Sequence, residues 1–207
     1  MNPGNIRLTT YNVNYSRRAM GEYEEYSWEN RRSDVYKFLE KTNSNIVFLQ
    51  EVLSQNQGEV QKCLSDYRWH FEKTNSRGGV CCNAIGIKKD FLPNVPQLNF
   101  SFDFSELEKT AEKVMGLIIG DLCLVNVHCP MAEEGRMAMV NLDKCIPKDK
   151  RLIIAGDFNS FPDCRGSEQV AAIQKITDTV CISDSAKSIV TGDTANRSFV
   201  AYPYDIV

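Results

Sequence analysis

RLIIAGDFNS, at residues 151–160, is the most informative segment of this chain. Its apolar run predicts a short buried strand over residues 151–155. Glycine followed by short polar residues predicts a turn over residues 156–160. Ligands of open α/β sheets bind outside the carboxyl ends of the strands. Asp157 and Asn159 are therefore the first candidates for functional residues.

Three other apolar runs each end in a residue with a polar side chain. These residues are Asn12, Glu51 and His128. If the strands end at one edge, two carboxylates, two amides and an imidazole gather there. We expect the side chains of Asp157 and Asn159 to line one pocket with Glu51 and His128. Oxygen ligands suit Mg²⁺, and the remaining groups can hold a phosphate. The pattern predicts a hard-cation site.

Each of these residues also has an alternative, purely structural role. Glu51 can cap the next segment, and His128 can be a hydrogen-bonded core histidine. Asp157 and Asn159 can simply form a turn after a glycine. Asn12, taken alone, indicates no more than the end of a strand.

Helices and strands are mixed along the whole chain. Adjacent strands require antiparallel hairpins as well as crossovers. This order predicts an α/β fold, a two-layer β-sandwich of mixed sheets flanked by helices in four layers, α/β/β/α. The expected strands are residues 6–14, 46–49, 67–71, 79–88, 114–119, 122–127, 151–155 and 198–202. The first expected helix starts at Trp28, with Ser27 as its N-cap, and Asn43 to Asn45 close it. The other expected helices are residues 58–64, 132–145 and 167–176.

Length and composition indicate an ordinary globular protein. The 207 residues are 43% hydrophobic and 25% charged, which excludes disordered and fibrous classes. No linker interrupts them, so we expect a single domain over residues 1–207. The formal net charge of -3 provides no overall attraction for a polyanion, so any nucleic-acid binding must be local.

Neither a membrane span nor a signal peptide is apparent in the sequence. No apolar run approaches the roughly 18 residues that a span requires, and we expect an intracellular protein, cytoplasmic or nuclear. None of the eight cysteines forms a C-x2-C pair. Buried free thiols in a reducing compartment are therefore favoured over a disulfide scaffold or a zinc site.

The polar strand ends, taken together, resemble those of a known family. Thr10-Tyr11-Asn12-Val13-Asn14, Leu49-Gln50-Glu51, Asn126-Val127-His128 and Gly156-Asp157-Phe158-Asn159-Ser160 are similar, in order and interval, to motifs of the endonuclease/exonuclease/phosphatase superfamily of metal-dependent phosphoesterases. The resemblance extends from Ile6 to about Tyr204. The last of the four motifs is the most specific.

The resemblance implies a role for each of these residues. Glu51 would be the main carboxylate ligand of Mg²⁺, or of Mn²⁺, and Asn12 would assist it. Asp157 and Asn159 would orient the scissile phosphate and the attacking water, and His128 would donate a hydrogen bond to a phosphate oxygen. A cation and aimed donors stabilise the charge that grows during in-line attack.

One feature of the family is missing from this sequence. Family members end in a strand with an Asp-His pair, but here the histidines are His70 and His128 alone. The last strand is therefore expected to be missing and activity to be weak. His70 is expected to be an ordinary edge-strand residue. A non-catalytic relative, acting as a binding or regulatory module, is the alternative to the phosphodiesterase.

The sequence points to a phosphate ester as substrate without choosing between a nucleic acid and a small phosphoester. Arg17 and Arg18 follow the strand that carries Asn12, so they are best placed to contact a phosphate. Arg31-Arg32 and Lys88-Lys89 are further basic pairs, and such pairs are usually found on solvated faces. Tyrosines near residues 11–26 can stack on bases or simply pack in a core.

Overall fold

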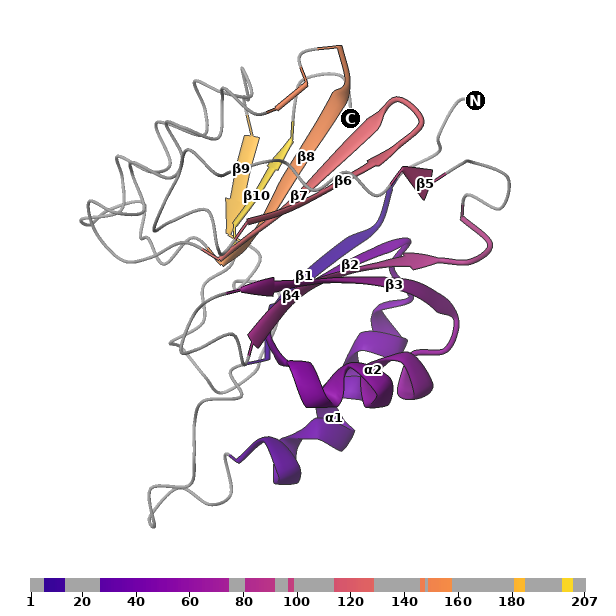
Figure 1. Ribbon diagram of the computed structural model, residues 1–207, viewed down its shortest axis with the longest axis vertical. Helices are drawn as coiled ribbons and strands as arrows, with labels where there is room; N and C mark the ends of the chain where they lie inside the picture. Colours follow the sequence, from indigo (N-terminus) through magenta and orange to yellow (C-terminus); the bar gives the residue numbers. More distant parts are fainter. Residues whose placement is uncertain are drawn as a thin grey trace, which may run out of the picture. The chain divides into compact units, whose positions relative to one another are not determined.

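The computed structural model describes two compact units, Met1–Asn94 and Val95–Val207, each with its own mixed sheet (Figure 1). The described residues are 6–13, 27–74, 81–91, 97–98, 114–128, 146–147, 149–157, 181–184 and 199–202, with only the backbone considered at 74, 97–98, 181–184 and 199–202. The expected α/β class with two mixed sheets is confirmed. The single domain over residues 1–207 stays a prediction.

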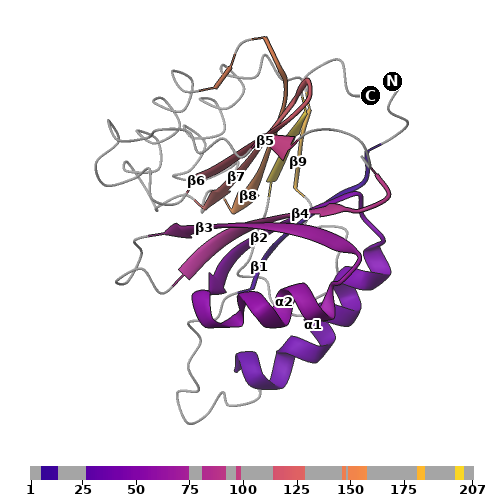
Figure 2. The same ribbon diagram turned by 45° about the vertical axis from the view of Figure 1, so that its right-hand side comes forward.

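The first unit contains a four-stranded sheet in the order β1-β2-β4-β3. Strands β1 and β2 are parallel, and the other neighbours are antiparallel. The two α-helices lie on one face of this sheet (Figures 1 and 2). The elements are β1 (Leu8–Asn12), α1 (Trp28–Thr42), β2 (Ile46–Leu53), the short 3-10 helix η2 (Ser54–Asn56), α2 (Gln57–Cys63), β3 (Tyr67–Thr74) and β4 (Cys81–Lys88).

Helix α1 begins and ends as its sequence predicts. The Ser27 hydroxyl accepts a hydrogen bond from the Asn30 amide at 3.4 Å, which caps the first turn. At the other end, Asn43 adopts the left-handed conformation, with φ 49°, and its N–H donates to the Glu40 carbonyl. Between these caps, Val35 and Leu39 face the core at helical spacing.

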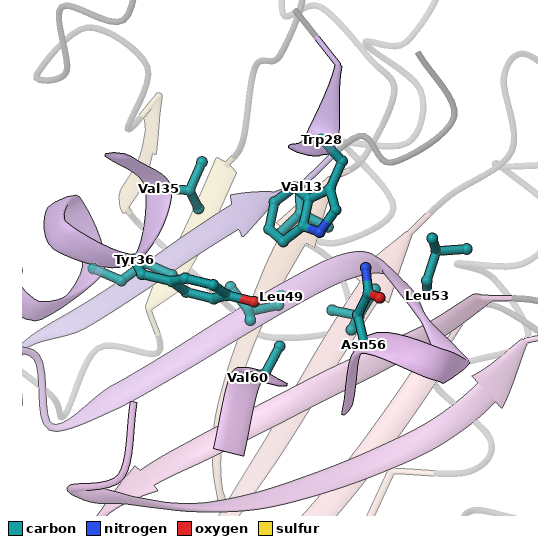
Figure 3. A pocket seen from close by; sticks show the side chains of 10 residues that line it. Val13, Trp28, Val35, Tyr36, Leu49, Leu53, Asn56 and Val60 are labelled. Carbon is teal, nitrogen blue, oxygen red and sulfur yellow. The ribbon is translucent and has the colours of Figure 1, made fainter. Parts of the chain in front are cut away.

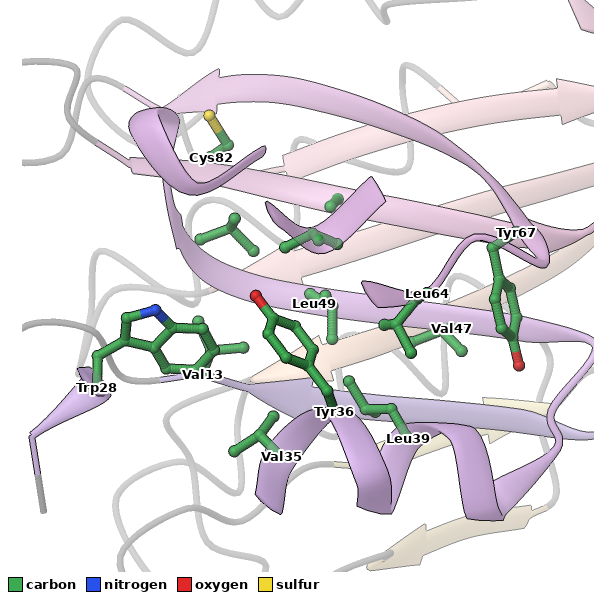
Figure 4. Packing of buried hydrophobic residues seen from close by; sticks show 13 residues of the cluster. Val13, Trp28, Val35, Tyr36, Leu39, Val47, Leu49, Leu64, Tyr67 and Cys82 are labelled. Atoms are coloured by element: carbon green, nitrogen blue, oxygen red, sulfur yellow. The ribbon is translucent and has the colours of Figure 1, made fainter. Parts of the chain in front are cut away.

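The core of the first unit lies between the helices and the sheet (Figure 4). The rings of Trp28 and Tyr36 meet edge to face, with centroids 5.8 Å apart. Each large apolar side chain that is fully buried here stabilises the fold by roughly 1.5–3 kcal/mol. The cluster comprises Val13, Trp28, Val35, Tyr36, Leu39, Val47, Leu49, Val52, Val60, Leu64, Tyr67, Cys82 and Ala84.

A small apolar pocket interrupts this core beside Trp28 and Tyr36 (Figure 3). The pocket is barely large enough for one water molecule, whose centre has about 10 Å³ of free space there. Among the described residues, neither the Trp28 indole nitrogen nor the Tyr36 hydroxyl has a hydrogen-bond partner. Burial, with the nearby Glu59 carboxylate, raises the pKa of Tyr36 well above its usual value, so its hydroxyl stays protonated. The lining residues are Val13, Trp28, Val35, Tyr36, Leu39, Leu49, Val52, Leu53, Asn56 and Val60.

Two buried tyrosines of this core are expected to respond differently to loss of the hydroxyl group. The Tyr67 hydroxyl donates to the Ser44 carbonyl at 2.8 Å, and Tyr67→Phe leaves that buried carbonyl without this donor. We expect this variant to lose about 1–2 kcal/mol of unfolding free energy, whereas Tyr36→Phe changes it by less than about 0.5 kcal/mol. Urea denaturation measures both values. Equal losses in the two variants would contradict this assignment.

The second unit contains a six-stranded sheet in the order β5-β6-β7-β8-β10-β9. Strands β7 and β8 are parallel, and the other neighbours are antiparallel. These strands lie side by side in both views (Figures 1 and 2). They are β5 (Gln97–Leu98), β6 (Val114–Ile119), β7 (Leu122–His128), β8 (Arg151–Asp157), β9 (Cys181–Asp184) and β10 (Phe199–Tyr202).

A tight hairpin and an ion pair fix the amino-terminal ends of β7 and β8. Gly120, with φ 61°, turns the chain from β6 into β7. The guanidinium group of Arg151 binds the Asp121 carboxylate, with Nε to Oδ2 at 2.9 Å, and lowers the pKa of Asp121. The Arg151 amide also donates to the Asp121 carbonyl. Both strands therefore start in register, and they also end in register.

The structure corrects several expected strand ends. Strand β1 spans Leu8–Asn12 instead of residues 6–14, and β3 continues past residue 71 to Thr74. Strand β2 continues through Glu51 to Leu53, and β8 continues through Gly156 to Asp157. The short strands β5 and β9 were not expected from the sequence. The expected helices over residues 132–145 and 167–176 lie outside the described residues.

The cysteines whose side chains are described are free thiols, as expected. Cys81, Cys82 and Cys123 are buried, and Cys63 is partly exposed. Burial raises the pKa of Cys123 to about 12, so its thiol stays protonated. The other four cysteine side chains lie outside the description. None of the described helices has the length and apolar character that a membrane span needs.

Candidate functional site

Glu51 lies in a β-bulge rather than after the end of a strand. In the β2–β4 pairing, Leu49 faces Ala84 and Val52 faces Cys82, so two residues of β2 lie opposite one residue of β4. Glu51 takes φ 57° within this bulge, a left-handed conformation that costs a non-glycine residue roughly 1–2 kcal/mol. Bulges of this kind redirect a side chain and are frequent next to active sites.

The bulge brings the Glu51 carboxylate to the side chain of Asn12. Strands β1 and β2 are parallel, with Asn12 opposite Gln50. The Asn12 amide nitrogen donates to Glu51 Oε1 at 3.1 Å. Asn12 is buried, whereas Glu51 is partly exposed. The structure therefore brings these two predicted residues together, and Glu51 keeps part of its surface exposed.

The alternative role of Glu51 as a helix cap does not hold. The segment after β2 is η2, whose N-cap residue is Leu53, and no described side chain caps it. The left-handed backbone at Glu51, the buried amide of Asn12 beside it and the partial exposure of Glu51 together favour a functional role.

The chemistry of this pair fits Mg²⁺. Carboxylate and amide oxygens are hard ligands, and protein-bound Mg²⁺ usually keeps several waters and one or two carboxylates. Within the described part of the chain, no group of three or more His, Cys, Asp or Glu residues gathers. Binding of Mg²⁺ or Mn²⁺ by Glu51 and Asn12 stays a prediction.

In the second unit, His128 and Asp157 lie opposite each other. They are the last residues of the parallel strands β7 and β8, and they are paired in register. Asp157 is 6% exposed and His128 is partly exposed. An acceptor and an imidazole thus share the carboxyl edge of this sheet, where ligands of α/β sheets commonly bind.

Gly156 makes this pairing possible. It has φ 149°, and a Cβ atom built on it would lie 1.9 Å from the Val127 carbonyl oxygen. The sequence predicted that Gly156 and Asp157 form a turn, which is wrong, because both residues belong to β8. The glycine is needed for the close approach of β8 to β7.

The remaining predicted residues, Asn159, Arg17 and Arg18, lie outside the described residues. The expectation that Asn12, Glu51, His128, Asp157 and Asn159 surround one point stays a prediction. His70 lies in β3, at one end of the four-strand order, as expected of an edge-strand residue.

Two residues that the sequence did not single out support the Asn12–Glu51 pair. The buried Gln50 side chain donates to the Thr10 hydroxyl at 3.1 Å. The Arg31 guanidinium group donates to the Val13 carbonyl at 3.0 Å. A polar Gln inside an apolar run was a usable signal for the first. Nothing in the pair Arg31-Arg32 distinguished the second.

Comparisons with known proteins agree with the fold. The model of the Endonuclease/Exonuclease/phosphatase family matches residues 9–204. Three similar crystal structures are a humanized D. rerio TDP2, ANGEL2 in complex with adenosine-2',3'-vanadate, and an AP endonuclease from Archaeoglobus fulgidus. No curated protein sequence matches the chain.

These structural similarities are distant but extensive. The TDP2 structure has a TM-score of 0.58 and 15% identity, over 97% of this chain and 83% of that one. ANGEL2, described as a 2',3'-cyclic phosphatase, has a TM-score of 0.56 and 18% identity, over 76% of this chain and 54% of that one. The AP endonuclease has a TM-score of 0.56 and 16% identity, over 96% of this chain and 87% of that one. Identities this low show the fold alone.

Proposed function

Because the chain belongs to the Endonuclease/Exonuclease/phosphatase family, whose members hydrolyse phosphoesters, we propose that it is a magnesium-dependent phosphoesterase. In this proposal the enzyme cleaves a phosphodiester by in-line attack of water. The observation that carries the proposal is the bulge at Glu51, where a strained backbone aims a carboxylate at the amide of Asn12. Backbone strain of this kind concentrates at functional sites.

The residues of the first unit would hold the ion. The Glu51 carboxylate would be its main protein ligand, and Asn12 would orient that carboxylate through the hydrogen bond at 3.1 Å. When bound, Mg²⁺ supplies positive charge that offsets the negative charge on the phosphoryl oxygens.

The residues of the second unit would handle water and phosphate. The Asp157 carboxylate, when ionised, only accepts hydrogen bonds, so it would hold the attacking water by its protons. An imidazole N–H of His128 would donate to a non-bridging phosphate oxygen, and Asn159 would orient the same phosphate. Fixed donors of this kind stabilise charge that develops in the transition state.

A substrate that carries a nucleotide phosphate fits this proposal best. One similar structure, of D. rerio TDP2, is complexed with a single-strand DNA product, and ANGEL2 holds adenosine-2',3'-vanadate. The formal net charge of -3 gives no overall attraction for such a substrate. Positively charged side chains near the site would therefore bind it, and Arg17 and Arg18 are the candidates.

The proposal is tested with three phosphodiesters of different kinds. We expect bis(p-nitrophenyl) phosphate, adenosine 2',3'-cyclic phosphate or a short single-stranded DNA to be hydrolysed with Mg²⁺ and not with EDTA. Asp157→Asn should lower kcat by about 10²- to 10⁴-fold, because it removes the negative charge and turns one accepting oxygen into a donating NH2 group. Asp121→Asn is the matched control, since it makes the same change at the amino-terminal end of β7.

Each outcome has a distinct meaning. Turnover that survives EDTA would overturn the metal requirement. Equal rates for wild type and Asp157→Asn would remove Asp157 from the mechanism. If Mn²⁺ binds but none of the three substrates is hydrolysed, the alternative of a non-catalytic binding or regulatory module is favoured instead.

A further inference from the structure

Arg31 joins helix α1 to the end of strand β1. The residue lies in the second turn of α1, and its terminal nitrogen donates to the carbonyl oxygen of Val13 at 3.0 Å. Val13 directly follows Asn12, the residue whose amide contacts Glu51. A charged donor makes a stronger hydrogen bond to a carbonyl than a neutral one. The contact therefore fixes the backbone next to Asn12.

The peptide groups of Val13 are held on two sides. Its N–H donates to the Gln50 carbonyl at 3.0 Å, immediately before Glu51 in the bulge. Its carbonyl accepts from Arg31. One contact ties the end of β1 to the bulge of β2, and the other ties it to α1. Each of these contacts is one residue away from a member of the Asn12–Glu51 pair.

Helix α1 is itself firmly placed, so it can serve as a support for this contact. Trp28 and Leu39 of the helix are buried in the same cluster as Val13 and Leu49 (Figure 4). The guanidinium group therefore projects from an element whose position the core determines. A donor on a fixed element holds its acceptor in place better than one on a free loop.

We propose that Arg31 is a positioning residue for the metal ligands. It holds the end of β1 so that the Asn12 amide stays aimed at the Glu51 carboxylate. This inference rests on the proposed function, because it concerns the same metal site. Without the Arg31 contact, the Val13 carbonyl loses its charged donor, the end of β1 loosens, and Asn12 no longer keeps Glu51 in its binding orientation.

The sign of the expected effect separates positioning from simple electrostatics. Arg31 is a cation, and removing a positive charge near a cation site should strengthen binding of the metal ion. Loss of positioning should weaken it, and removing outer-shell partners of metal ligands typically lowers affinity by 10–100-fold. We expect Arg31→Gln to weaken Mn²⁺ binding about 10-fold. Mn²⁺ is paramagnetic, so the electron spin resonance signal of the free ion measures how much of it is unbound.

Arg32→Gln is the matched control. Arg32 is the next residue of the same helix, and it forms an exposed ion pair with Glu59 at 3.1 Å. The change of charge is identical, but no contact with β1 is lost. We expect its Mn²⁺ affinity to stay within about 2-fold of wild type. Equal weakening by Arg31→Gln and Arg32→Gln would overturn the proposal.

A double-mutant cycle tests whether Arg31 acts through Asn12. In an Asn12→Ala background, Arg31→Gln should change Mn²⁺ affinity by less than about 2-fold, because the residue that it positions is gone. A further 10-fold loss in that background would show that Arg31 acts by another route. Arg31→Lys keeps one donor without the planar fork, and its affinity should fall between wild type and Arg31→Gln. If Arg31→Gln does not fold, Arg31→Lys carries the test.

Failure of this inference and failure of the proposed function look different. If Glu51→Gln leaves Mn²⁺ binding unchanged, the metal site itself is wrongly assigned. If Glu51→Gln abolishes binding while Arg31→Gln leaves it intact, the metal site stands and Arg31 is only a structural link between helix and strand.

Discussion

Gly156→Ala is expected to unfold the second unit or to destabilise it by more than about 4 kcal/mol. The added Cβ would lie 1.9 Å from the Val127 oxygen and 2.7 Å from the Val127 nitrogen, and both are backbone atoms of the neighbouring strand. Backbone cannot move aside as the end of a flexible side chain can. The φ of 149° is also unfavourable for any residue with a Cβ. Effects this large are rare and require such a direct clash.

Two other glycines calibrate this expectation in urea denaturation. In α2, a Cβ on Gly58 would meet nothing within 4 Å, so Gly58→Ala should stabilise the protein by about 0.5–1 kcal/mol. In β4, a Cβ on Gly86 would lie 2.6 Å from the Trp69 ring, which is a side chain and not backbone. Gly86→Ala should therefore be intermediate. A loss below about 1 kcal/mol in Gly156→Ala would contradict the geometry.

The requirement at Gly156 also concerns function. The residue after it is Asp157, which pairs with His128 at the ends of β8 and β7. If β8 moved away from β7 to accommodate a methyl group, the two side chains would separate. We therefore interpret Gly156 as the reason that these two candidate residues share one sheet edge.

Local sequence signals were sufficient wherever local contacts determine the structure. Ser27 and Asn43 bound helix α1, because a hydroxyl caps the amide of Asn30 and Asn tolerates the left-handed conformation. The polar residues that end β1 and β7, Asn12 and His128, were also identified, although the strand expected over residues 6–14 is longer than β1 at both ends.

Tertiary pairing decided the features that the sequence did not reveal. After Leu49, the polar Gln50 and Glu51 look like the end of a strand, yet β2 continues to Leu53. One extra residue in the bulge restores the alternation, so that Val52 again faces the core. The glycine and aspartate after Ala155 look like a turn, but pairing with β7 keeps them extended. Neither pairing partner can be identified from the local sequence.

Long side chains were the least predictable part of the candidate site. Arg31 and Arg32 are adjacent and chemically identical, and basic pairs are usually solvated. The structure places one on the Val13 carbonyl and the other on the surface beside Glu59. Only the direction in which each side chain leaves the helix distinguishes them, and that depends on which face of α1 the core buries.

Glu51→Gln is expected to weaken binding of Mg²⁺ or Mn²⁺ by at least about 100-fold. Glutamine has nearly the shape of glutamate and keeps an oxygen that accepts from Asn12, so the bulge and the hydrogen bond at 3.1 Å should survive. The substitution removes one negative charge from the proposed metal site. Opposite charges 4 Å apart attract by about 4 kcal/mol at an effective dielectric constant of 20, and partial exposure of Glu51 reduces this value.

Thermal unfolding and calorimetry both measure this effect. A ligand at 100 times its Kd stabilises the native state by about 2.7 kcal/mol, so Mg²⁺ should raise the Tm of wild type but not that of Glu51→Gln. Without metal, the two Tm values should agree closely, because the substitution removes no packing. Glu59→Gln, a charge-removing change in the same unit that breaks the ion pair with Arg32, should respond to Mg²⁺ as wild type does. If Glu51→Gln gains the same Tm increase as wild type, then Glu51 is not the ligand, and the strain in its backbone has a purely structural cause.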